Sequence, residues 1–226
     1  YYQPLEQVAP VAVADAVGHT HIDVAWLWDL YQTRHKAVRS FSTMLKLMER
    51  YPEFKFMSSQ PVLYSFVQED HPDLFERIRA RVVEGRWEAE GGMWLEADCN
   101  LTGGESLVRQ LLYGRAYYLQ RFGQASKVFW MPDVFGYSWA LPQIMKRSGV
   151  DYFFTSKLVN NDTNHFPHSL FMWQGVDGTR ILSYLQRLGY NGDLDAKTLS
   201  TIRARFDQKD VCDTTLMTIG YGDGGG

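Results

Sequence analysis

The residues best suited to chemistry stand close together near the start of the chain, in the stretch Gly18-His19-Thr20-His21-Ile22-Asp23. Side chains in an extended segment repeat every two residues, so His19, His21 and Asp23 are expected on one side. Imidazole and carboxylate groups together suit a borderline divalent cation, zinc first. The same residues could instead cap the turn that follows, so the rest of the chain has to decide between a metal site and a turn.

Two aspartates further along the chain are also candidates for chemistry. Asp133 follows Trp130-Met131-Pro132, and Asp223 stands in the glycine-rich end of the sequence. Taken alone, Asp133 is a turn or N-cap residue and Asp223 is a turn former. The glycine run could also cradle a phosphate, but no Lys-Ser or Lys-Thr pair follows it, so a P-loop is not supported.

Composition excludes several classes of function. The 226 residues carry a net charge of −3, with Lys and Arg spread along the chain, so there is no basic stripe for nucleic acid or an anionic membrane. Aromatic residues make up 15%, enough for a thick core and for exposed rings that could contact a sugar or a flat ligand. The only cysteines, Cys99 and Cys212, lack metal or redox spacing and make no disulfide framework.

Membrane and targeting signals are missing from the sequence. No apolar stretch approaches the roughly 20 residues of a membrane span, and no signal-like run follows basic residues. We therefore expect a cytoplasmic protein. The chain starts without Met and ends in three glycines, which indicates a piece cut from a longer parent.

Strand-like runs alternate with helical patterns along the whole chain. Apolar or β-branched runs bounded by turn residues indicate strands, and apolar residues spaced by three and four indicate helices. The predicted strands cover residues 11–17, 54–58, 87–91, 127–131, 152–155, 170–173, 181–185 and 216–219. The predicted helices cover about 38–51, 61–84 with a break at 71–72, 102–122, 138–148 and 198–206.

Local signals mark the ends of several elements. Tyr51-Pro52 ends the first helix, and Thr102 to Glu105 has the Thr-x-x-Glu form of a capping box. Ser138 can cap the helix that follows it. Asp177-Gly178 marks the turn of a hairpin between the strands at 170–173 and 181–185.

This alternation predicts an α/β fold with a mostly parallel or barrel-like sheet and flanking helices, because parallel strands need crossover connections. In such folds the carboxyl ends of the strands form the ligand-binding rim. His21 and Asp23 follow the first predicted strand, Asp133 follows the fourth and Asp223 follows the last. Residues far apart in sequence are therefore expected to meet at one rim, where an active site would lie.

Four motifs, in order and approximate spacing, resemble those of the family 38 glycoside hydrolases, the retaining α-mannosidases. The motifs are His21-Ile22-Asp23-Val24-Ala25-Trp26, Glu90-Gly91-Gly92-Met93-Trp94, the run from Trp130 to Ser138 (WMPDVFGYS), and Gly222-Asp223-Gly224-Gly225-Gly226. The resemblance implies a zinc enzyme, with residues 1–226 as its incomplete N-terminal catalytic α/β domain. Helical and β domains would follow in the full protein.

The resemblance also implies roles for single residues. His21 and Asp23 would bind one zinc ion, and Asp133 would both touch the zinc and act as the nucleophile. A further His ligand would lie beyond the end of this chain, so the chain alone is expected to bind zinc weakly. Because the family pattern uses His21, we expect His19 to be a structural partner.

The chemistry agrees with these roles. A retaining glycosidase needs one carboxylate to attack the anomeric carbon and a second to protonate the leaving oxygen, about 5 Å away. Asp223 is the candidate for this general acid and base, on a flexible glycine-rich loop. Trp26 and Phe135 fit as apolar walls for a sugar face, and Tyr190 as a contact to a sugar hydroxyl. The expected substrate is an α-mannoside or a mannose-containing oligosaccharide, and the full protein could be a homo-oligomer.

Two other readings stay open at this point. A metal-dependent, amidohydrolase-like hydrolase would use His19 and His21 as ligands and needs further histidines at later strand ends. The later candidates at strand ends are aspartates, while His165 and His168 are expected in a loop and Lys157 is not assigned to the site. A non-catalytic carbohydrate-binding module would bind mannosides without hydrolysing them.

Overall fold

Two four-stranded sheets form the centre of the fold. The computed structural model describes residues 13–226, so the first two residues of the predicted strand 11–17 lie outside the described residues. The first sheet has the order β3-β2-β1-β8 and is parallel, and the second has the order β4-β5-β7-β6 with β6 antiparallel to β7. The strands are β1 (Val13–Thr20), β2 (Phe56–Ser58), β3 (Trp87–Ala89), β4 (Val128–Met131), β5 (Tyr152–Thr155), β6 (Leu170–Gln174), β7 (Arg180–Leu185) and β8 (Thr214–Ile219).

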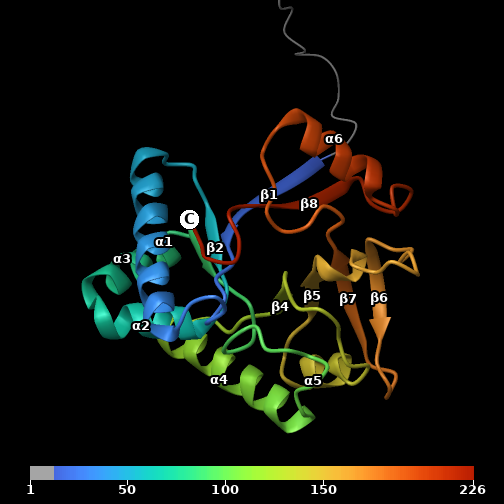
Figure 1. Cartoon of the computed structure of the whole chain (residues 1–226), viewed down its shortest axis with the longest axis horizontal. Helices are drawn as coiled ribbons and strands as arrows, with labels where there is room; N and C mark the ends of the chain where they lie inside the picture. Colours follow the sequence, from blue (N-terminus) through green and yellow to red (C-terminus); the bar gives the residue numbers. More distant parts are fainter. Residues whose placement is uncertain (1–12) are drawn as a thin grey trace, which may run out of the picture.

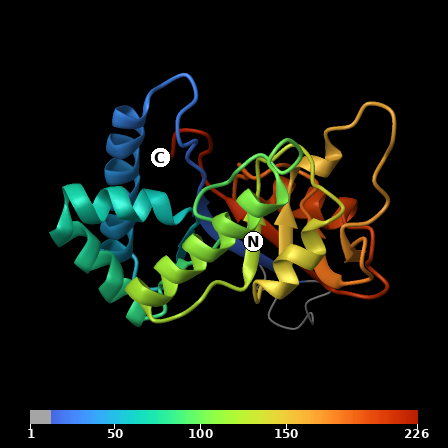
Figure 2. The ribbon, with the colours of Figure 1, turned by 90° about the horizontal axis from the view of Figure 1, so that it is seen from below.

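The helices cover the outside of the sheets (Figure 1). Helices α1 to α3 gather beside the first sheet, α5 lies near β7, and α6 lies beside β8 (Figures 1 and 2). The helices are α1 (Leu30–Arg50), α2 (Pro61–Asp70), α3 (Pro72–Val83), α4 (Gly104–Phe122), α5 (Leu141–Arg147) and α6 (Ala196–Arg205), with a short 3-10 helix η1 (Lys157–Val159) after β5. None of the helices in residues 13–226 has the length and apolar character to cross a membrane.

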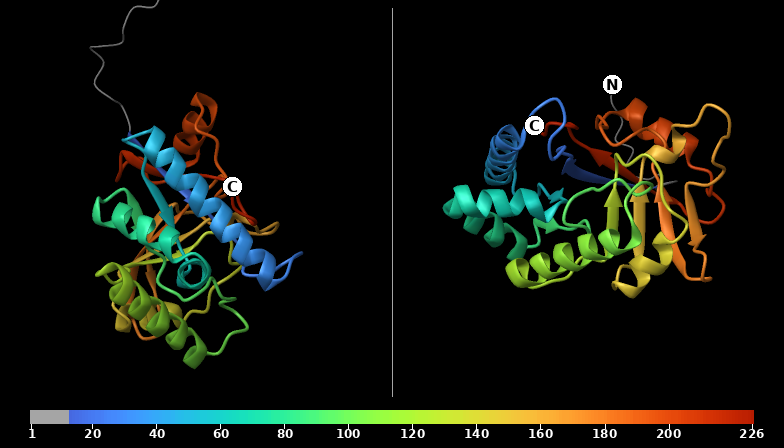
Figure 3. Two further views of the ribbon diagram at one scale, coloured as in Figure 1. Left: turned by 90° about the vertical axis from the view of Figure 1, so that its left-hand side faces the viewer. Right: turned by 60° about the horizontal axis from the view of Figure 1, so that its bottom comes forward.

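The two sheets contact each other at two places, near β3 and β4 and between β7 and β8, so that their strands form a barrel-like ring (Figure 3). Strand β6 lies beyond β7, at the edge of the second sheet. Between β3 and β4, Gly91 forms a parallel bridge with Phe129, and the Trp130 N–H donates to the Gly91 carbonyl at 3.2 Å. The backbone of β7 is paired on both sides, with β5 and with β6, so side chains connect it to β8. The Tyr184 hydroxyl donates to the Leu216 carbonyl at 2.9 Å and accepts from its N–H at 3.0 Å.

A second side chain closes the same seam. The Gln186 amide accepts from the Thr218 N–H at 3.0 Å and donates to the Thr218 hydroxyl at 2.7 Å. Inside the ring, buried side chains from both sheets pack together, and Trp130 stacks on Phe154 with 3.9 Å between ring centroids. The mostly parallel, barrel-like α/β fold predicted from the sequence is therefore confirmed.

Most helix ends follow the local signals in the sequence. Helix α1 begins after Asp29, whose side chain accepts from the Gln32 N–H at 2.9 Å, and ends before Tyr51. Pro72 begins α3 directly after the C-cap of α2, because proline lacks the N–H that a continuing helix would need.

Two predicted caps are wrong by a few residues. Gly103, with no side chain to accept a hydrogen bond, is the N-cap of α4, so Glu105 falls at the second helical position and the Thr102 capping box does not form. Helix α5 begins only after Ala140, because Ser138 is used earlier, accepting from the Ala140 N–H at 3.3 Å.

Helix α4 packs so closely on the segment after β3 that only glycine fits at position 114. A Cβ on Gly114 would lie 2.3 Å from the Gly92 carbonyl oxygen and within 2.7 Å of backbone atoms of Met93 and Trp94. These atoms belong to the backbone of one of the sequence motifs, so they cannot yield by a simple side-chain rotation.

Replacing this glycine is expected to destabilise the fold. Gly114→Ala should lower the free energy of unfolding by about 3 kcal/mol, because an overpacked methyl group forces the backbone apart. Denaturant unfolding monitored by circular dichroism would measure the loss. The matched control is Gly104→Ala in the same helix, where a Cβ meets nothing within 4 Å. An equal effect of the two substitutions would show that helix propensity, and not the close approach, sets the stability.

Candidate active site

The loops after β1 and β8 pair with each other at the carboxyl ends of the strands. Ile22 forms an antiparallel bridge with Gly224, and the Asp23 N–H donates to the Asp223 carbonyl at 2.8 Å. Asp223 itself has a left-handed backbone (φ 62), which is uncommon for a residue with a side chain. The pairing places two predicted site residues on adjoining backbone segments.

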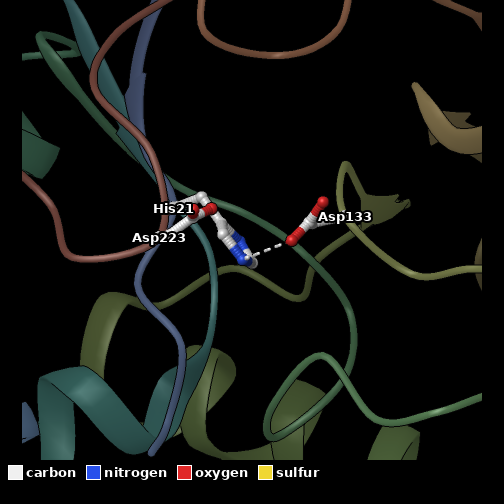
Figure 4. Close-up of side chains that lie close together, drawn as sticks. All are labelled: His21, Asp133 and Asp223. Carbon is white, nitrogen blue, oxygen red and sulfur yellow. Dashed lines mark ion pairs between the residues drawn. The ribbon is translucent and has the colours of Figure 1, made fainter. Parts of the chain in front are cut away.

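Three predicted site residues converge at this rim. One nitrogen of His21 and one carboxylate oxygen each from Asp133 and Asp223 all lie within 4.8 Å of one another. Figure 4 shows the three side chains arriving from separate parts of the chain, with His21 and Asp133 directed toward each other. The residues that follow β1, β4 and β8 therefore meet at one rim, as the sequence predicts.

His21 is the buried centre of this cluster, with a side chain only 4% exposed. Its Nε2 lies 3.0 Å from Asp23 Oδ1 and 3.7 Å from Asp133 Oδ2. Its Nδ1 lies 3.1 Å from Glu96 Oε2. Burial lowers the pKa of His21, but the carboxylates of Glu96 and Asp23 outweigh burial and raise this pKa to about 10.

The sequence reasoning missed Glu96, which follows β3 and is 4% exposed. The Ser59 hydroxyl donates to its carboxylate at 2.9 Å, and its N–H donates to the Gln60 amide oxygen at 3.1 Å. The other end of the Gln60 amide donates to the Ile22 carbonyl at 2.8 Å. Glu96 and His21 are thus held relative to each other. In the sequence, nothing around Glu96 distinguishes it from a glutamate on the protein surface.

Glu90, which belongs to one of the sequence motifs, has a structural role at the start of β4. Its carboxylate accepts from the N–H groups of Lys127 and Val128, each at 2.6 Å, at the start of β4. Burial raises the pKa of Glu90, although these two N–H donors act in the opposite direction. The motif therefore anchors the strand that leads to Asp133.

Asp133 sits in a braced turn directly after β4. The Tyr137 hydroxyl lies 3.0 Å from the Met131 carbonyl oxygen and 2.8 Å from that of Val134, and the Ser156 hydroxyl donates to the Pro132 carbonyl at 2.6 Å. These contacts leave the carboxylate facing the rim.

Lys157, which the sequence analysis left unassigned, reaches the rim in the structure. Its ammonium lies 2.5 Å from Asp133 Oδ1. It also lies 4.5 Å from the centroid of the Phe135 ring. Its position directly after β5 was the only signal in the sequence that could have pointed to this contact.

Tyr190 links the histidine strand to the loop of Asp223. Its hydroxyl donates to Asp223 Oδ1, and its carbonyl accepts from His19 Nε2 at 2.8 Å and from the Thr218 hydroxyl at 2.9 Å. Burial, followed by contact with the Asp223 carboxylate, raises the pKa of Tyr190. His19 is therefore a structural partner, as expected, and burial lowers its pKa to about 4.

Trp26 and Phe135 are exposed aromatic rings at the rim. They are 60% and 65% exposed, so neither is a core residue. Trp26 stands beside Trp28, with ring centroids 5.7 Å apart, on the loop that carries Asp23. The site thus combines charged groups at its centre with apolar surfaces that a ligand can contact.

The residues present fit a divalent cation. Of the predicted ligands, His21 and Asp133 belong to the group of closest donor atoms, together with Asp223. Asp23, the third predicted ligand, lies 3.0 Å from His21 but is not in that group. The Nε2 of His21 faces the carboxylates of Asp23 and Asp133, while its Nδ1 faces Glu96. An imidazole backed by a carboxylate and flanked by further carboxylates is a donor set typical of zinc.

The amidohydrolase-like reading finds no support in this geometry. The Nε2 of His19 is engaged with the Tyr190 carbonyl, and His165 and His168 lie on an exposed loop, where His168 contacts Gln208. Among residues 13–226, His21 is the only histidine in the cluster of candidate metal ligands.

Comparisons with known proteins agree with the motifs. The model of the glycosyl hydrolases family 38 N-terminal domain matches residues 12–226. Alpha-mannosidase G of Dictyostelium discoideum and alpha-mannosidase 2C1 of Homo sapiens are each 43% identical over 93% of this chain, which spans 20% of their length. The fold is shared with the crystal structure of an alpha-mannosidase from Enterococcus faecalis V583, with a TM-score of 0.75 and 22% identity over 95% of this chain and 25% of that one. The chain belongs to glycosyl hydrolase family 38, and residues 12–226 match its N-terminal domain.

Proposed function

We propose that the full-length protein is a retaining, zinc-dependent α-mannosidase that hydrolyses terminal α-mannosides through a covalent mannosyl-aspartate. The observation that carries the proposal is the convergence of His21, Asp133 and Asp223 within 4.8 Å. It occurs in a chain that is 43% identical to proteins named alpha-mannosidases. Residues 1–226 would be the N-terminal part of the catalytic domain.

The separation of the two aspartates supports retention of configuration. One carboxylate oxygen of Asp133 lies within 4.8 Å of one from Asp223. Retaining glycosidases keep their two carboxyl groups about 5 Å apart, whereas inverting enzymes need more room for a water molecule.

In the proposed mechanism Asp133 attacks the anomeric carbon, and Asp223 protonates the leaving glycosidic oxygen. Asp223 then takes a proton from the water that releases the sugar. Tyr190 holds Asp223 through its hydroxyl, so its first role is to position this carboxylate. The exposed rings of Trp26 and Phe135 can pack against the sugar and exclude water from one face.

His21, Asp23 and Asp133 would hold the zinc ion, and Glu96 would orient His21. When bound, the cation supplies positive charge that polarises sugar hydroxyls and favours the ionised form of Asp133. Zinc as the metal, formation of a homo-oligomer and a cytoplasmic location stay predictions. A carbohydrate-binding module would show the same rim but no turnover.

The first test concerns the metal. The full-length protein should contain about one zinc ion per chain and lose activity with a chelator, and His21→Ala should lower metal content and activity together.

Glu96→Gln should weaken metal binding by about 10- to 100-fold, because the carboxylate no longer orients the imidazole. Competition with a chromophoric chelator would measure the affinity. Glu88→Gln, at an exposed position on β3, is the matched control. Full activity of a metal-free preparation would contradict the zinc assignment.

The second test identifies the nucleophile. A fluorinated mannosyl donor that slows release of the ester should label Asp133, because the proposed intermediate is an ester of its carboxylate. Peptide mapping by mass spectrometry would locate the label, and Asp133→Asn should abolish it. A label on a different carboxylate, or product with inverted configuration by proton NMR, would rule out this role.

The third test concerns Asp223. Asp223→Ala should slow hydrolysis of mannobiosides by about 100-fold or more but largely spare ester formation, measured as kcat/KM, with aryl mannosides that have acidic phenols, because only poor leaving groups need a proton. Release of the ester should still slow, because Asp223 no longer takes the proton from water. Added azide should restore turnover of the activated substrates by replacing water in the second step. Steady-state kinetics on both substrate classes would measure the difference. Equal losses on both classes without an azide effect would assign Asp223 a role in loop structure only.

A further inference from the structure

The ion pair between Lys157 and Asp133 is unusual because both partners are largely withdrawn from solvent. Nζ lies 2.5 Å from Oδ1, and the two side chains are 17% and 16% exposed. A second Lys-Asp pair, Lys146 with Asp151, has nearly the same separation of 2.6 Å but exposures of 52% and 37%. Exposed pairs are weak because water screens them, so the same charges interact more strongly at the rim.

The surroundings fix the ammonium group in place. Its Nζ lies 4.5 Å from the centroid of the Phe135 ring and 5.3 Å from that of Tyr190, so both aromatic rings favour a cation there. The Lys157 N–H donates to the Thr155 hydroxyl at 3.1 Å, and the neighbouring Ser156 is bonded to the turn of Asp133. The lysine is therefore positioned by the same strand ends that position the aspartate.

The two oxygens of Asp133 face different partners. Oδ2 is directed toward His21, with 3.7 Å to Nε2, while Oδ1 faces Lys157. The ammonium charge thus acts on the carboxylate from the side opposite the candidate metal ligands. Of the lysines in residues 13–226, Lys157 is the one that forms an ion pair with Asp133.

The geometry points to Lys157 as a residue that acts through Asp133 in the second half of the reaction, when the mannosyl ester is broken. This inference rests on the proposed function. In that step a water oxygen bonds to the anomeric carbon, the bond from that carbon to the Asp133 oxygen breaks, and its electron pair returns to the carboxylate. The water proton passes to Asp223. A fixed ammonium next to the carboxylate stabilises the charge that reappears there.

The same charge has the opposite effect in the first half of the reaction. When Asp133 attacks the sugar, its negative charge decreases, so Lys157 stabilises the starting carboxylate more than the transition state. Only interactions that strengthen toward the transition state speed a step. Lys157 therefore slows formation of the ester and speeds its release.

The experiment compares Lys157→Met with the wild-type full-length enzyme, using 2,4-dinitrophenyl α-mannoside. We expect kcat to fall by about 10- to 100-fold with a parallel or larger fall in KM, so that kcat/KM stays the same or rises by up to about threefold, because ester release is slowed and ester formation is not. Stopped-flow absorbance should show a burst of about one phenol per active site. The ester formed with a fluorinated mannosyl donor should form at least as fast as in the wild type and decay more slowly by the same factor as kcat.

Two further variants separate charge from shape. Lys157→Arg keeps a cation at this position and should restore most of kcat and remove the burst. Lys146→Met removes the matched exposed pair and should leave all constants unchanged. A fall in kcat/KM equal to the fall in kcat, with unchanged KM and no burst, would overturn the inference, because it would mean that Lys157 only holds Asp133 for attack. An unchanged kcat would also overturn it.

Failure of this inference is distinguishable from failure of the proposed function. If the wild-type protein hydrolyses no α-mannoside and takes no label on Asp133, the proposed function fails. If the wild type turns over normally and Lys157→Met does not accumulate the ester, only the assignment of Lys157 fails.

Discussion

The concentration of negative charge around one buried imidazole constrains the rest of the site. Asp23, Glu96 and Asp133 lie within 4 Å of His21, and Asp223 completes the group. Carboxylates so close together repel one another strongly where water is scarce, so they must be offset by cations. Without a metal, a protonated His21 and Lys157 supply two positive charges. When a divalent cation is bound, His21 must be neutral to ligate it, and the cation together with Lys157 would supply the positive charge.

The barrel holds this repulsive group together because each charged residue is fixed through backbone contacts. Gln60 links Glu96 to the strand end before Asp23, and the pairing of Ile22 with Gly224 fixes the loop of Asp223. Tyr190 joins the same loop to the strand of His19. The site is thus preorganised before a ligand arrives, which is what electrostatic catalysis requires.

Much of this arrangement could be predicted from the sequence because local signals and the fold act together. The breaks at Tyr51-Pro52 and His71-Pro72 gave helix ends, and the alternation of strands and helices placed His21, Asp133 and Asp223 on one rim. Helix starts were less certain, since a shift of one residue turned the Thr102 capping box into a glycine cap.

The residues that the sequence could not reveal act through three-dimensional contacts without a sequence pattern. Glu96 becomes important only because Ser59 and Gln60 bury and orient it. Lys157 becomes important because the end of β5 lies beside the end of β4. The contact between β7 and β8 could not be predicted either, because the side chains of Tyr184 and Gln186 and one isolated bridge, between Gly192 and Ile219, make it. This contact has a consequence for the rim, because no continuous backbone ladder supports it. Single substitutions there can change the spacing of β7 and β8, and so the opening between their rim loops, while every parallel ladder stays intact.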